Sequence, residues 1–515
     1  MKPRYTITTP IYYVNDLPHV GHAYCSLACD ALARFKRLDG YEVFFLTGTD
    51  EHGQKVARSA TAAGMEPQEF VDKVSRNFRD LAETLNLSND AFIRTTEERH
   101  ISACQALWNE LMKRGEIYLG KYAGWYAVRD EAYYAESELT VGPNGKKIAP
   151  SGAECEWVEE PSYFFRLSGW GERLLAFYDA NPDFILPHYR RNEVVSFVKS
   201  GLRDLSISRT AISWGVPVPD TPGHVMYVWL DALTNYISAL GYPDMQASAY
   251  RRFWPADLHM VGKDILRFHA VYWPAFLMAA GIEPPRRVFA HGWWTNDGRK
   301  MSKSLGNVIS PHELIDRYGL DQTRYFMLRE VPFGNDSDFS HAAMIRRING
   351  DLANDLGNLA QRVLSMINKS CGAMVPEHGA FTDADNWLLN KAEELLPHVR
   401  AEMDVQAFHK ALDHIWAVIG DGNRYVDEQA PWALKKTDPA RMATVLYVLA
   451  EVLRRLAIII QPFMPESMGR LLNQLAVPEN TRSFSALDLS RSLKPGTPLP
   501  APEGIFPRVA EIGKA

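Results

Sequence analysis

Two histidines lie three residues apart in the stretch LPHVGHAYC, residues 17–25, with a glycine between them. Imidazole N–H groups can donate hydrogen bonds to phosphate oxygens, and a helix N-terminus favours anions. If a helix begins here, His19 and His22 lie at positions i and i+3 on one helical face. Gly21 would let a flat ligand such as a purine ring approach the backbone. The pattern predicts a phosphate cradle, with a surface histidine pair and a metal site as alternatives.

The residues around this pair carry signals for the start of a helix. Asn15 or Asp16 can cap the helix, and Pro18 suits its first turn. Apolar residues then recur at three- and four-residue spacing until Asp39 and Gly40, which end the pattern. The sequence therefore predicts a helix whose first turns carry both histidines.

A second group of charged residues lies in the stretch GRKMSKSLGN, residues 298–307. Lys300 and Lys303 flank two small or flexible residues in a loop bounded by glycines. Two ammonium groups on such a loop can neutralise charge that builds up on a departing pyrophosphate. A solvated basic loop is the alternative. The chain contains no GxxxxGK[ST] motif, which excludes a P-loop nucleotide site.

Four short apolar runs have the composition of strands buried on both faces of a parallel sheet: residues 4–9, 41–48, 257–262 and 286–292. Helical patterns follow the first and third runs, which predicts an α/β doubly wound, Rossmann-like domain. Ligands bind at the carboxyl ends of such strands. Polar or glycine-rich groups follow every run, including Asp50 and His52 after the second and Asp264 after the third. The sequence therefore predicts a ligand site along this edge.

The rest of the chain differs in pattern from this α/β part. Residues 118–215 hold short alternating pieces and many aromatics, which predicts an inserted β-containing subdomain. From residue 344 the pattern is helical, with further helices near 384–403, 405–429 and 438–460, which predicts an all-α bundle. The tail from residue 491 is rich in proline and glycine, and we expect it to be extended, either packed on the surface or loose. The predicted boundaries are 1–117 and 216–290 for the α/β halves, 118–215 for the insert, 291–343 for the lysine loop and its surroundings, 344–490 for the bundle and 491–515 for the tail.

Composition favours a large globular protein of ordinary type, with 515 residues, 46% hydrophobic residues and a net charge of −6. The net charge does not indicate nucleic-acid binding, but an RNA-binding enzyme needs only local basic patches. The five scattered cysteines form no CxxC pair, so neither a disulfide framework nor a zinc knuckle is expected. The start of the chain has no apolar signal segment, and the most apolar run carries Glu451, Arg454 and Arg455. These features predict a cytoplasmic protein without a membrane span.

Several longer motifs extend the two groups of charged residues. HxGH after the first strand and KMSKS after the last resemble the two signatures of class I aminoacyl-tRNA synthetases. The stretches TPIYYVND, TGTDEHG, YVWLDALTNY, GKDILRFH and AHGWWTNDGRKMSKS, with LGNLAQR and YVDEQAPW in the helical part, resemble methionyl-tRNA synthetases in particular. The resemblance spans roughly residues 4–460, with the motifs in the same order.

The resemblance implies a two-step reaction. The carboxylate of L-methionine joins the α-phosphate of ATP to give methionyl-adenylate and pyrophosphate, and the methionyl group then passes to the 3′ end of tRNA(Met), including initiator tRNA. Because the nucleophile is already an ionised carboxylate, the first step needs positioning and charge stabilisation rather than a general base. We expect Mg²⁺ to accompany ATP. The implied catalytic residues are His19, His22, Lys300 and Lys303, and the implied ATP-binding residues are those four with Gly21, Gly262, Asp264 and His291.

The resemblance also implies a methionine pocket. Trp229, Ala232, Leu233, Tyr236 and Ile237 form one helical stripe, and core packing is the simpler interpretation of Leu233 and Ile237. Aromatic walls suit a thioether, since each sulfur–aromatic contact stabilises by about 0.3–1.5 kcal/mol. Asp50 would pair with the substrate ammonium. The implied methionine-binding residues are Ile11, Tyr13, Asp50, Trp229, Ala232, Tyr236, Ile265 and His269.

In the helical part, Asn358, Arg362 and Trp432 match the family's anticodon-binding residues, and side chains of these types suit unpaired bases. Without the resemblance, surface polar residues and a core tryptophan would be the simpler interpretation.

The chain departs from many members of this family in its inserted region, which contains Cys155 as its one cysteine. A tetrahedral zinc site needs four good ligands, so we expect no zinc and a subdomain held together by its apolar residues. The chain also ends without the C-terminal tRNA-binding domain that dimerises in some relatives, so we expect a monomer. The alternatives are a synthetase for leucine, isoleucine, valine or cysteine, a small-molecule adenylyltransferase and a non-catalytic RNA-binding relative, against which the intact signatures argue. The first three would need a large editing insertion, a cysteine enzyme would need thiol or zinc ligands, and an adenylyltransferase is much shorter.

Overall fold

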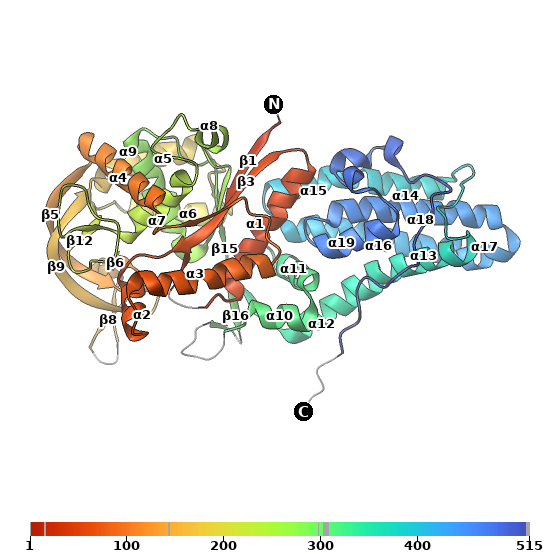
Figure 1. Ribbon diagram of the computed structural model, residues 1–515, viewed down its shortest axis with the longest axis horizontal. Helices are drawn as coiled ribbons and strands as arrows, with labels where there is room; N and C mark the ends of the chain where they lie inside the picture. The colour runs from red at the N-terminus through yellow and green to blue at the C-terminus, as the bar shows by residue number, and fades with distance from the viewer. Residues whose placement is uncertain (1, 15–16, 143–144, 297, 302–307, 511–515) are drawn as a thin grey trace. The chain divides into compact units, whose positions relative to one another are not determined.

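The computed structural model describes residues 2–14, 17–142, 145–296, 298–301 and 308–510. Figure 1 shows the chain coloured from its N-terminus to its C-terminus. The chain forms two compact units. Unit 1 comprises residues 1–3, 19–43 and 292–515, and unit 2 comprises residues 4–18 and 44–291.

Unit 2 is built on the predicted parallel sheet. The apolar runs become strands because their side chains are buried on both faces, as in β14, where four of the five residues are buried. The spatial order is β10 (Ile185–Leu186), β15 (Val288–His291), β14 (Leu258–Gly262), β1 (Arg4–Thr8), β3 (Glu42–Asp50) and β2 (Tyr12–Tyr13), with β4 (Ala91–Arg94) paired to β3. In this sheet, the strand pairs β1–β14, β10–β15, β14–β15, β2–β3 and β3–β4 are all parallel. The α/β prediction is confirmed.

Two separate hydrophobic clusters join helices to this sheet. The larger cluster contains Leu46 and Val261 from the strands together with residues of α4 (Glu98–Lys113), α7 (Val228–Ser238) and α9 (Trp273–Ala280). The smaller one joins Tyr12 of β2 to α2 (Gln54–Ala62) and α3 (Pro67–Thr84). Every residue of α7 is buried, so its predicted stripe lies within a helix that is enclosed on all sides.

The region 118–215 contains the expected β-structure and more. Its core is a long antiparallel pair, β5 (Ile117–Ala127) and β9 (Glu154–Phe165), which Figure 1 shows as a curved ribbon. The smaller strands are β6 (Ala132–Tyr134), β7 (Thr140–Val141), β8 (Lys147–Ile148), β11 (Leu205–Ser206) and β12 (Ser208–Arg209), the last paired with β13 (Val225–Met226). The helices are α5 (Gly171–Ala180) and α6 (His188–Lys199), with α8 (Ser248–Phe253) further along the chain. Between α5 and α6 the chain returns to the main sheet as β10.

A buried arginine lies at the centre of this region. The Arg209 guanidinium carbon is 4.3 Å from the ring centroid of Tyr133, 4.8 Å from that of Tyr227 and 5.2 Å from that of Tyr126. Glu160 lies 3.9 Å away as the opposite charge. A small apolar cluster has three alanines and Cys155 at its buried centre, with Trp125, Tyr134 and Leu139 packed against them. The prediction that apolar residues hold this region together is therefore incomplete, because cation–π contacts supply part of its core.

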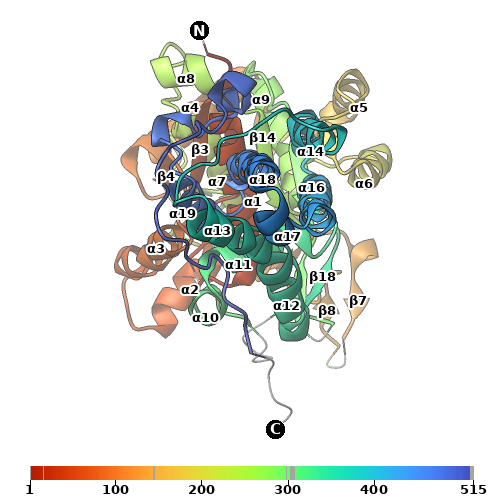
Figure 2. The same cartoon turned by 90° about the vertical axis from the view of Figure 1, so that its right-hand side faces the viewer.

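Unit 1 contains the remaining elements. They are α1 (Val20–Leu38), β16 (Trp294–Asn296), β17 (Arg299–Lys300), α10 (Pro311–Tyr318), α11 (Leu320–Arg329), β18 (Ser337–Phe339), α12 (His341–Arg347), a π-helical segment (Ile348–Gly357), α13 (Asn358–Ser370), α14 (Asp383–Glu393), α15 (Leu395–Asp404), α16 (Phe408–Gln429), α17 (Pro431–Thr437), α18 (Pro439–Ile460) and α19 (Pro465–Gln474). Figure 2 shows α13, α14, α16 and α18 grouped as a bundle, as predicted.

The most apolar run forms α18, which is buried along most of its length. Its charges pair inside the protein: the Glu451 carboxylate lies 2.6 Å from Arg454 and 3.0 Å from Arg455. None of the described helices combines the length and the apolar character that crossing a membrane requires. The tail packs on this unit, since the Leu493 carbonyl accepts a hydrogen bond from Tyr447 and the Ile505 carbonyl accepts one from Arg470.

Candidate active site

In unit 1, the histidine pair forms the start of α1. His19 is the N-cap residue and lies before the first helical residue, Val20. Its Nδ1 accepts a hydrogen bond from the Gly21 N–H at 3.0 Å, and Nδ1 of His22 accepts one from the His19 N–H at 3.0 Å. The prediction that Asn15 or Asp16 caps the helix was therefore wrong, and these two residues lie outside the described part of the chain. The two rings are 3.9 Å apart between centroids, but only His22 is within the helix.

These two hydrogen bonds fix which ring nitrogens can donate. Because Nδ1 of each neutral ring accepts, the proton of each ring is on Nε2. Gly21 has an intramolecular role as well, since a Cβ there would lie 2.9 Å from Cε1 of His19. Both rings thus carry their proton on Nε2 and lie at a helix N-terminus, which is suited to an anion.

Of the lysine pair, the backbone of Lys300 is described, in β17. Residues 299–300 pair with β16, and the turn between these strands includes Gly298 at φ +68°. The Asp338 carboxylate accepts hydrogen bonds from the Gly298 N–H at 2.9 Å and from the Thr295 hydroxyl at 2.7 Å. Lys303 lies outside the described residues. The start of the predicted loop is therefore a hairpin held by one carboxylate.

In unit 2, the candidate methionine residues include buried polar atoms without a protein partner. Oδ1 of Asp50, the hydroxyl of Tyr13 and Nε1 of Trp229 have no hydrogen-bond partner among the described residues. Asp50 ends β3 opposite Tyr13 of β2. Burial raises the pKa of Asp50 well above its usual range, and the nearby Asp231 raises it further. Buried polar atoms are normally paired, so these three are suited to groups that a ligand would bring.

Three of the candidate methionine residues, Trp229, Tyr236 and Ile265, lie around a fourth, His269. The Trp229 ring is 6.1 Å from the His269 ring and stacks on Phe268 at 3.8 Å. The Tyr236 hydroxyl lies 2.7 Å from Nε2 of His269, and Nδ1 of His269 lies 3.0 Å from the Ile265 carbonyl. Burial lowers the pKa of His269 to about 4, so the ring is neutral and Nε2 accepts from Tyr236. Ala232 is buried on the same helix as Trp229, and Ile11 is partly buried against the same cluster.

Sequence reasoning missed His259, the second residue of β14. Its ring stacks on Tyr236 with centroids 4.0 Å apart. Nδ1 lies 2.8 Å from the Thr8 hydroxyl, and Nε2 accepts a hydrogen bond from the Trp273 indole at 3.3 Å. Burial lowers the pKa of His259 well below its usual range. A histidine inside the apolar run DLHMVG was the signal that could have identified it.

A second missed group surrounds Asp231 on α7. Its Oδ2 lies 2.7 Å from Nδ1 of His52, and its Oδ1 lies 2.7 Å from Nε2 of His100 on α4. Burial alone would raise the pKa of Asp231, but His52 and His100 outweigh it and lower the pKa to about 2. The signal in the sequence was a carboxylate inside the apolar stretch VWLDAL.

Three candidate ATP-binding residues lie together where β14 and β15 end. Gly262 pairs with His291 across the two strands. A Cβ on residue 262 would lie 2.6 Å from Oδ1 of Asp264 and 3.9 Å from Cε1 of His291. A side chain at residue 262 would therefore displace the Asp264 carboxylate, at the edge of the sheet where ligands bind.

In the bundle, Arg362 and Trp432 lie side by side. The Arg362 guanidinium carbon is 5.4 Å from the Trp432 ring centroid, and Asp427 pairs with the same guanidinium at 2.8 Å. Trp432 is 49% exposed, so its interpretation as a core residue was wrong. Asn358 is exposed at the start of α13, one turn before Arg362. The exposed indole, guanidinium and amide are suited to stacking on bases and to base-edge contacts.

Two known families match the chain. The family described as tRNA synthetases class I (M) matches residues 5–364. The anticodon binding domain of methionyl tRNA ligase matches residues 375–514.

Individual proteins match over nearly the whole chain. The methionine–tRNA ligase of Brucella suis biovar 1 (strain 1330) is 58% identical over 510 residues, which cover 99% of each chain. That of Mycobacterium tuberculosis (strain ATCC 25618 / H37Rv) is 55% identical and covers 99% of this chain and 98% of its own. The solved structure of Mycobacterium tuberculosis methionyl-tRNA synthetase in complex with methionyl-adenylate superposes with a TM-score of 0.96 at 55% identity, covering 99% of this chain and 100% of that one. Its apo form superposes with a TM-score of 0.90 at 52% identity, covering 99% of each chain.

Proposed function

The chain belongs to the class I methionyl-tRNA synthetases, and on that premise we propose how its own residues divide the work of methionine–tRNA ligation. The enzyme activates L-methionine with ATP and then transfers the methionyl group to the 3′ end of tRNA(Met). In the first step a carboxylate oxygen of methionine bonds to the α-phosphorus of ATP, the bond from that phosphorus to the bridging oxygen breaks, and pyrophosphate leaves.

Methionine binds in unit 2, with its ammonium on Asp50 and its thioether among aromatic rings. Oδ1 of Asp50 carries this proposal, because it is buried and has no partner among the described residues, which is costly until a cation reaches it. Trp229, Tyr236 and His269 form the wall for the side chain. Tyr13, Ala232, Ile11 and Ile265 complete the pocket.

ATP is held by hydrogen-bond donors rather than by a P-loop. The Nε2–H groups of His19 and His22 donate to phosphate oxygens at the start of α1. Gly21, Gly262, Asp264 and His291 border the nucleoside, and Lys300 and Lys303 stabilise the charge that develops on pyrophosphate. Mg²⁺ accompanies the triphosphate, as is usual for ATP.

tRNA recognition takes place in the bundle, where Trp432 supplies a stacking surface and Arg362 and Asn358 contact base edges. Initiator tRNA is included among the substrates. We also propose a monomeric, cytoplasmic enzyme without zinc. Its domain boundaries are 1–117 and 216–290 for catalysis, 118–215 for the insert, 291–343 for the KMSKS loop and stem contacts, 344–490 for the anticodon domain and 491–515 for the tail.

The test of this assignment is pyrophosphate exchange measured with each of the twenty amino acids. Wild-type enzyme should exchange with methionine. Asp50→Asn should lower kcat/KM for methionine by about 30- to 5,000-fold, the usual effect of breaking a buried charge pair. Surface variant Asp413→Asn serves as the control. Exchange driven by leucine instead of methionine, or an unchanged Asp50→Asn enzyme, would contradict the proposal.

A further inference from the structure

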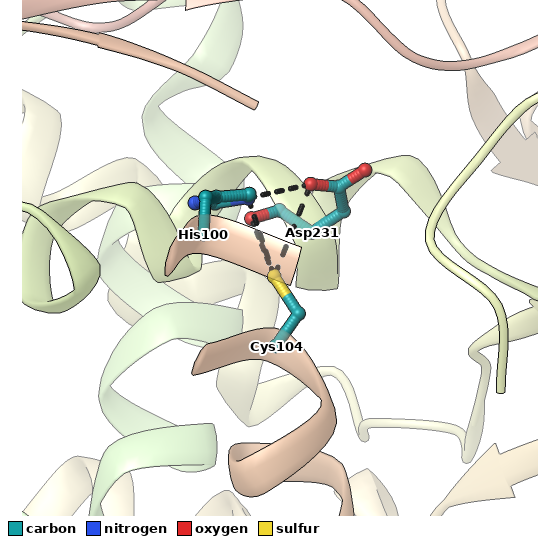
Figure 3. Close-up of side chains that lie close together, drawn as sticks. All are labelled: His100, Cys104 and Asp231. Atoms are coloured by element: carbon teal, nitrogen blue, oxygen red, sulfur yellow. Dashed lines mark hydrogen bonds and ion pairs between the residues drawn. The ribbon is translucent and has the colours of Figure 1, made fainter. Parts of the chain in front are cut away.

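A buried carboxylate in unit 2 is held by two imidazoles that come from different elements. Figure 3 shows His100 and Cys104 of α4 beside Asp231 of α7. Asp231 uses Oδ1 for Nε2 of His100 and Oδ2 for Nδ1 of His52, both at 2.7 Å. The other nitrogen of His100 lies 2.9 Å from the Ser238 hydroxyl. Both oxygens of Asp231 are thus engaged, and no part of its side chain is exposed.

His52 connects this cluster to Asp50. It follows Asp50 by two residues, just beyond the end of β3, and its Nδ1 lies 2.7 Å from the Asp231 carboxylate. The residue between them, Glu51, holds the main chain independently through Arg94, whose guanidinium donates to its two oxygens at 2.7 and 2.9 Å. The two residues that follow Asp50 are therefore each fixed to a different element, Glu51 to Arg94 and His52 to Asp231.

Two buried carboxylates lie in this region, and only Asp231 has both of its oxygens hydrogen-bonded to imidazoles. Asp50 and Asp231 are both buried, and each disfavours the ionised form of the other. The imidazoles of His52 and His100 compensate Asp231, while Oδ1 of Asp50 has no partner among the described residues. A cation that enters the pocket can therefore pair with Oδ1 of Asp50, whereas both oxygens of Asp231 are already hydrogen-bonded to imidazoles.

The same donors could be read as a metal site, since ligand atoms of His100, Cys104 and Asp231 all lie within 4.8 Å of one another. The Sγ of Cys104 lies 3.2 Å from Nε2 of His100 and 4.0 Å from Oδ1 of Asp231. However, the nitrogen that would bind a metal is already 2.7 Å from the carboxylate, which is a hydrogen-bond distance. The geometry thus favours a hydrogen-bonded cluster of Asp231, His52 and His100, which we call the clamp.

We propose that Asp231 is a positioning residue for methionine activation, which acts through His52 to hold the Asp50 carboxylate toward the substrate ammonium. This inference rests on the proposed role of Asp50. Asp231 also lies between Trp229 and Ala232 on α7, so the clamp ties the helix that bears the pocket wall to the end of β3.

The experiment compares binding of L-methionine with binding of 4-(methylsulfanyl)butanoate, which is methionine without its ammonium, by calorimetry on the full chain. Asp231→Asn should weaken methionine by about 100-fold, as expected for a displaced binding group, and leave the analogue nearly unchanged. His52→Ala should do the same, and His52→Asn should restore much of the loss because its amide places a donor near the position of Nδ1. His100→Ala is the matched control, since it removes the other imidazole from the same carboxylate without touching residues 50–52.

The outcomes separate the two proposals. If Asp231→Asn and His52→Ala weaken both ligands equally, the role of Asp231 is structural and this inference fails. If Asp50→Asn itself leaves the ratio of the two affinities unchanged, the proposed role of Asp50 fails. Stoichiometric metal in the wild-type enzyme that is lost in Cys104→Ser would also overturn the clamp. Where Asp231→Asn does not fold, the pair His52→Ala and His100→Ala decides between these outcomes.

Discussion

The hydroxyl of Tyr236 donates a hydrogen bond to Nε2 of His269 at 2.7 Å, and Nδ1–H of His269 donates to the Ile265 carbonyl at 3.0 Å. The imidazole is therefore held in one tautomer by a donor on one side and an acceptor on the other. Because burial lowers its pKa to about 4, the ring is neutral under ordinary conditions.

This neutral, buried histidine makes stability depend on pH. In the unfolded chain His269 has a pKa near 6.5, so between pH 6.5 and pH 4 the unfolded state binds a proton that the folded state does not. The contribution is complete above pH 6.5 and is lost as pH falls toward 4, at up to about 1.4 kcal/mol per pH unit. Urea unfolding at a series of pH values should give a shallower slope for His269→Gln than for wild type, with exposed His188→Gln as the control. Equal slopes for all three proteins would contradict the prediction.

Lys303→Ala should slow adenylate formation far more than it weakens methionine binding. The Lys303 ammonium would stabilise the negative charge that develops as pyrophosphate leaves, so it acts on the transition state. Its loss should lower kcat by about 100- to 1,000-fold. Single-turnover adenylate formation and methionine affinity measure the two effects separately. The exposed Lys121, changed to Ala, is the control. Equal losses in rate and affinity would indicate a structural role for Lys303.

Removal of metal should leave the inserted region folded. Dialysis against a chelator should not change the thermal unfolding of the enzyme, and elemental analysis should find less than one zinc per chain. Cys155→Ser should behave as wild type, because its thiol lies in a small apolar cluster of alanines. A stoichiometric zinc that is lost in Cys155→Ser would refute this prediction.

Arg209→Ala should destabilise the inserted region strongly. The change empties the space between three tyrosine rings and leaves the buried Glu160 without its opposite charge. Loss of one partner of a buried pair costs about 3–5 kcal/mol. Denaturant unfolding measures this cost, and exposed Arg129→Ala is the matched control. A loss similar to that of the control would mean that the cation–π contacts contribute little.

Trp432→Ala should weaken tRNA binding without affecting the first step. Stacking of a base on an aromatic side chain contributes about 1–3 kcal/mol, so KM for tRNA(Met) should rise by about 5- to 150-fold. Methionine-dependent pyrophosphate exchange should stay at the wild-type rate. Trp387, which is also exposed in unit 1, provides the control as Trp387→Ala. A fall in pyrophosphate exchange would show that Trp432 acts through the fold.

Four strands of the parallel sheet, β1, β3, β14 and β15, were predictable because each lies in a continuous apolar run. The helices were predictable where their apolar spacing extends over many residues. The return strand β10 was not predictable, since two residues carry no periodic signal. The start of α1 was placed incorrectly because histidine is an uncommon N-cap, and its cap depends on the direction of one side chain.

The individual site residues were predictable from motifs, but their connections were not. Asp231 is hydrogen-bonded to His100 and His52, which are 131 and 179 residues away in the sequence, so no local sequence pattern relates them. Likewise, His259 and Tyr236 belong to different elements, and only the packed sheet brings their rings together.

Gly21 leaves room for the His19 ring, which folds back over the first turn of α1. A side chain at this position would push the His19 ring aside, so a relative that no longer bound a nucleotide would still favour glycine here while His19 capped the helix. The HxGH motif therefore indicates how this helix begins as well as whether the enzyme binds ATP. Lys300 and Lys303 are therefore a better criterion than Gly21 for distinguishing active enzymes from inactive relatives by sequence.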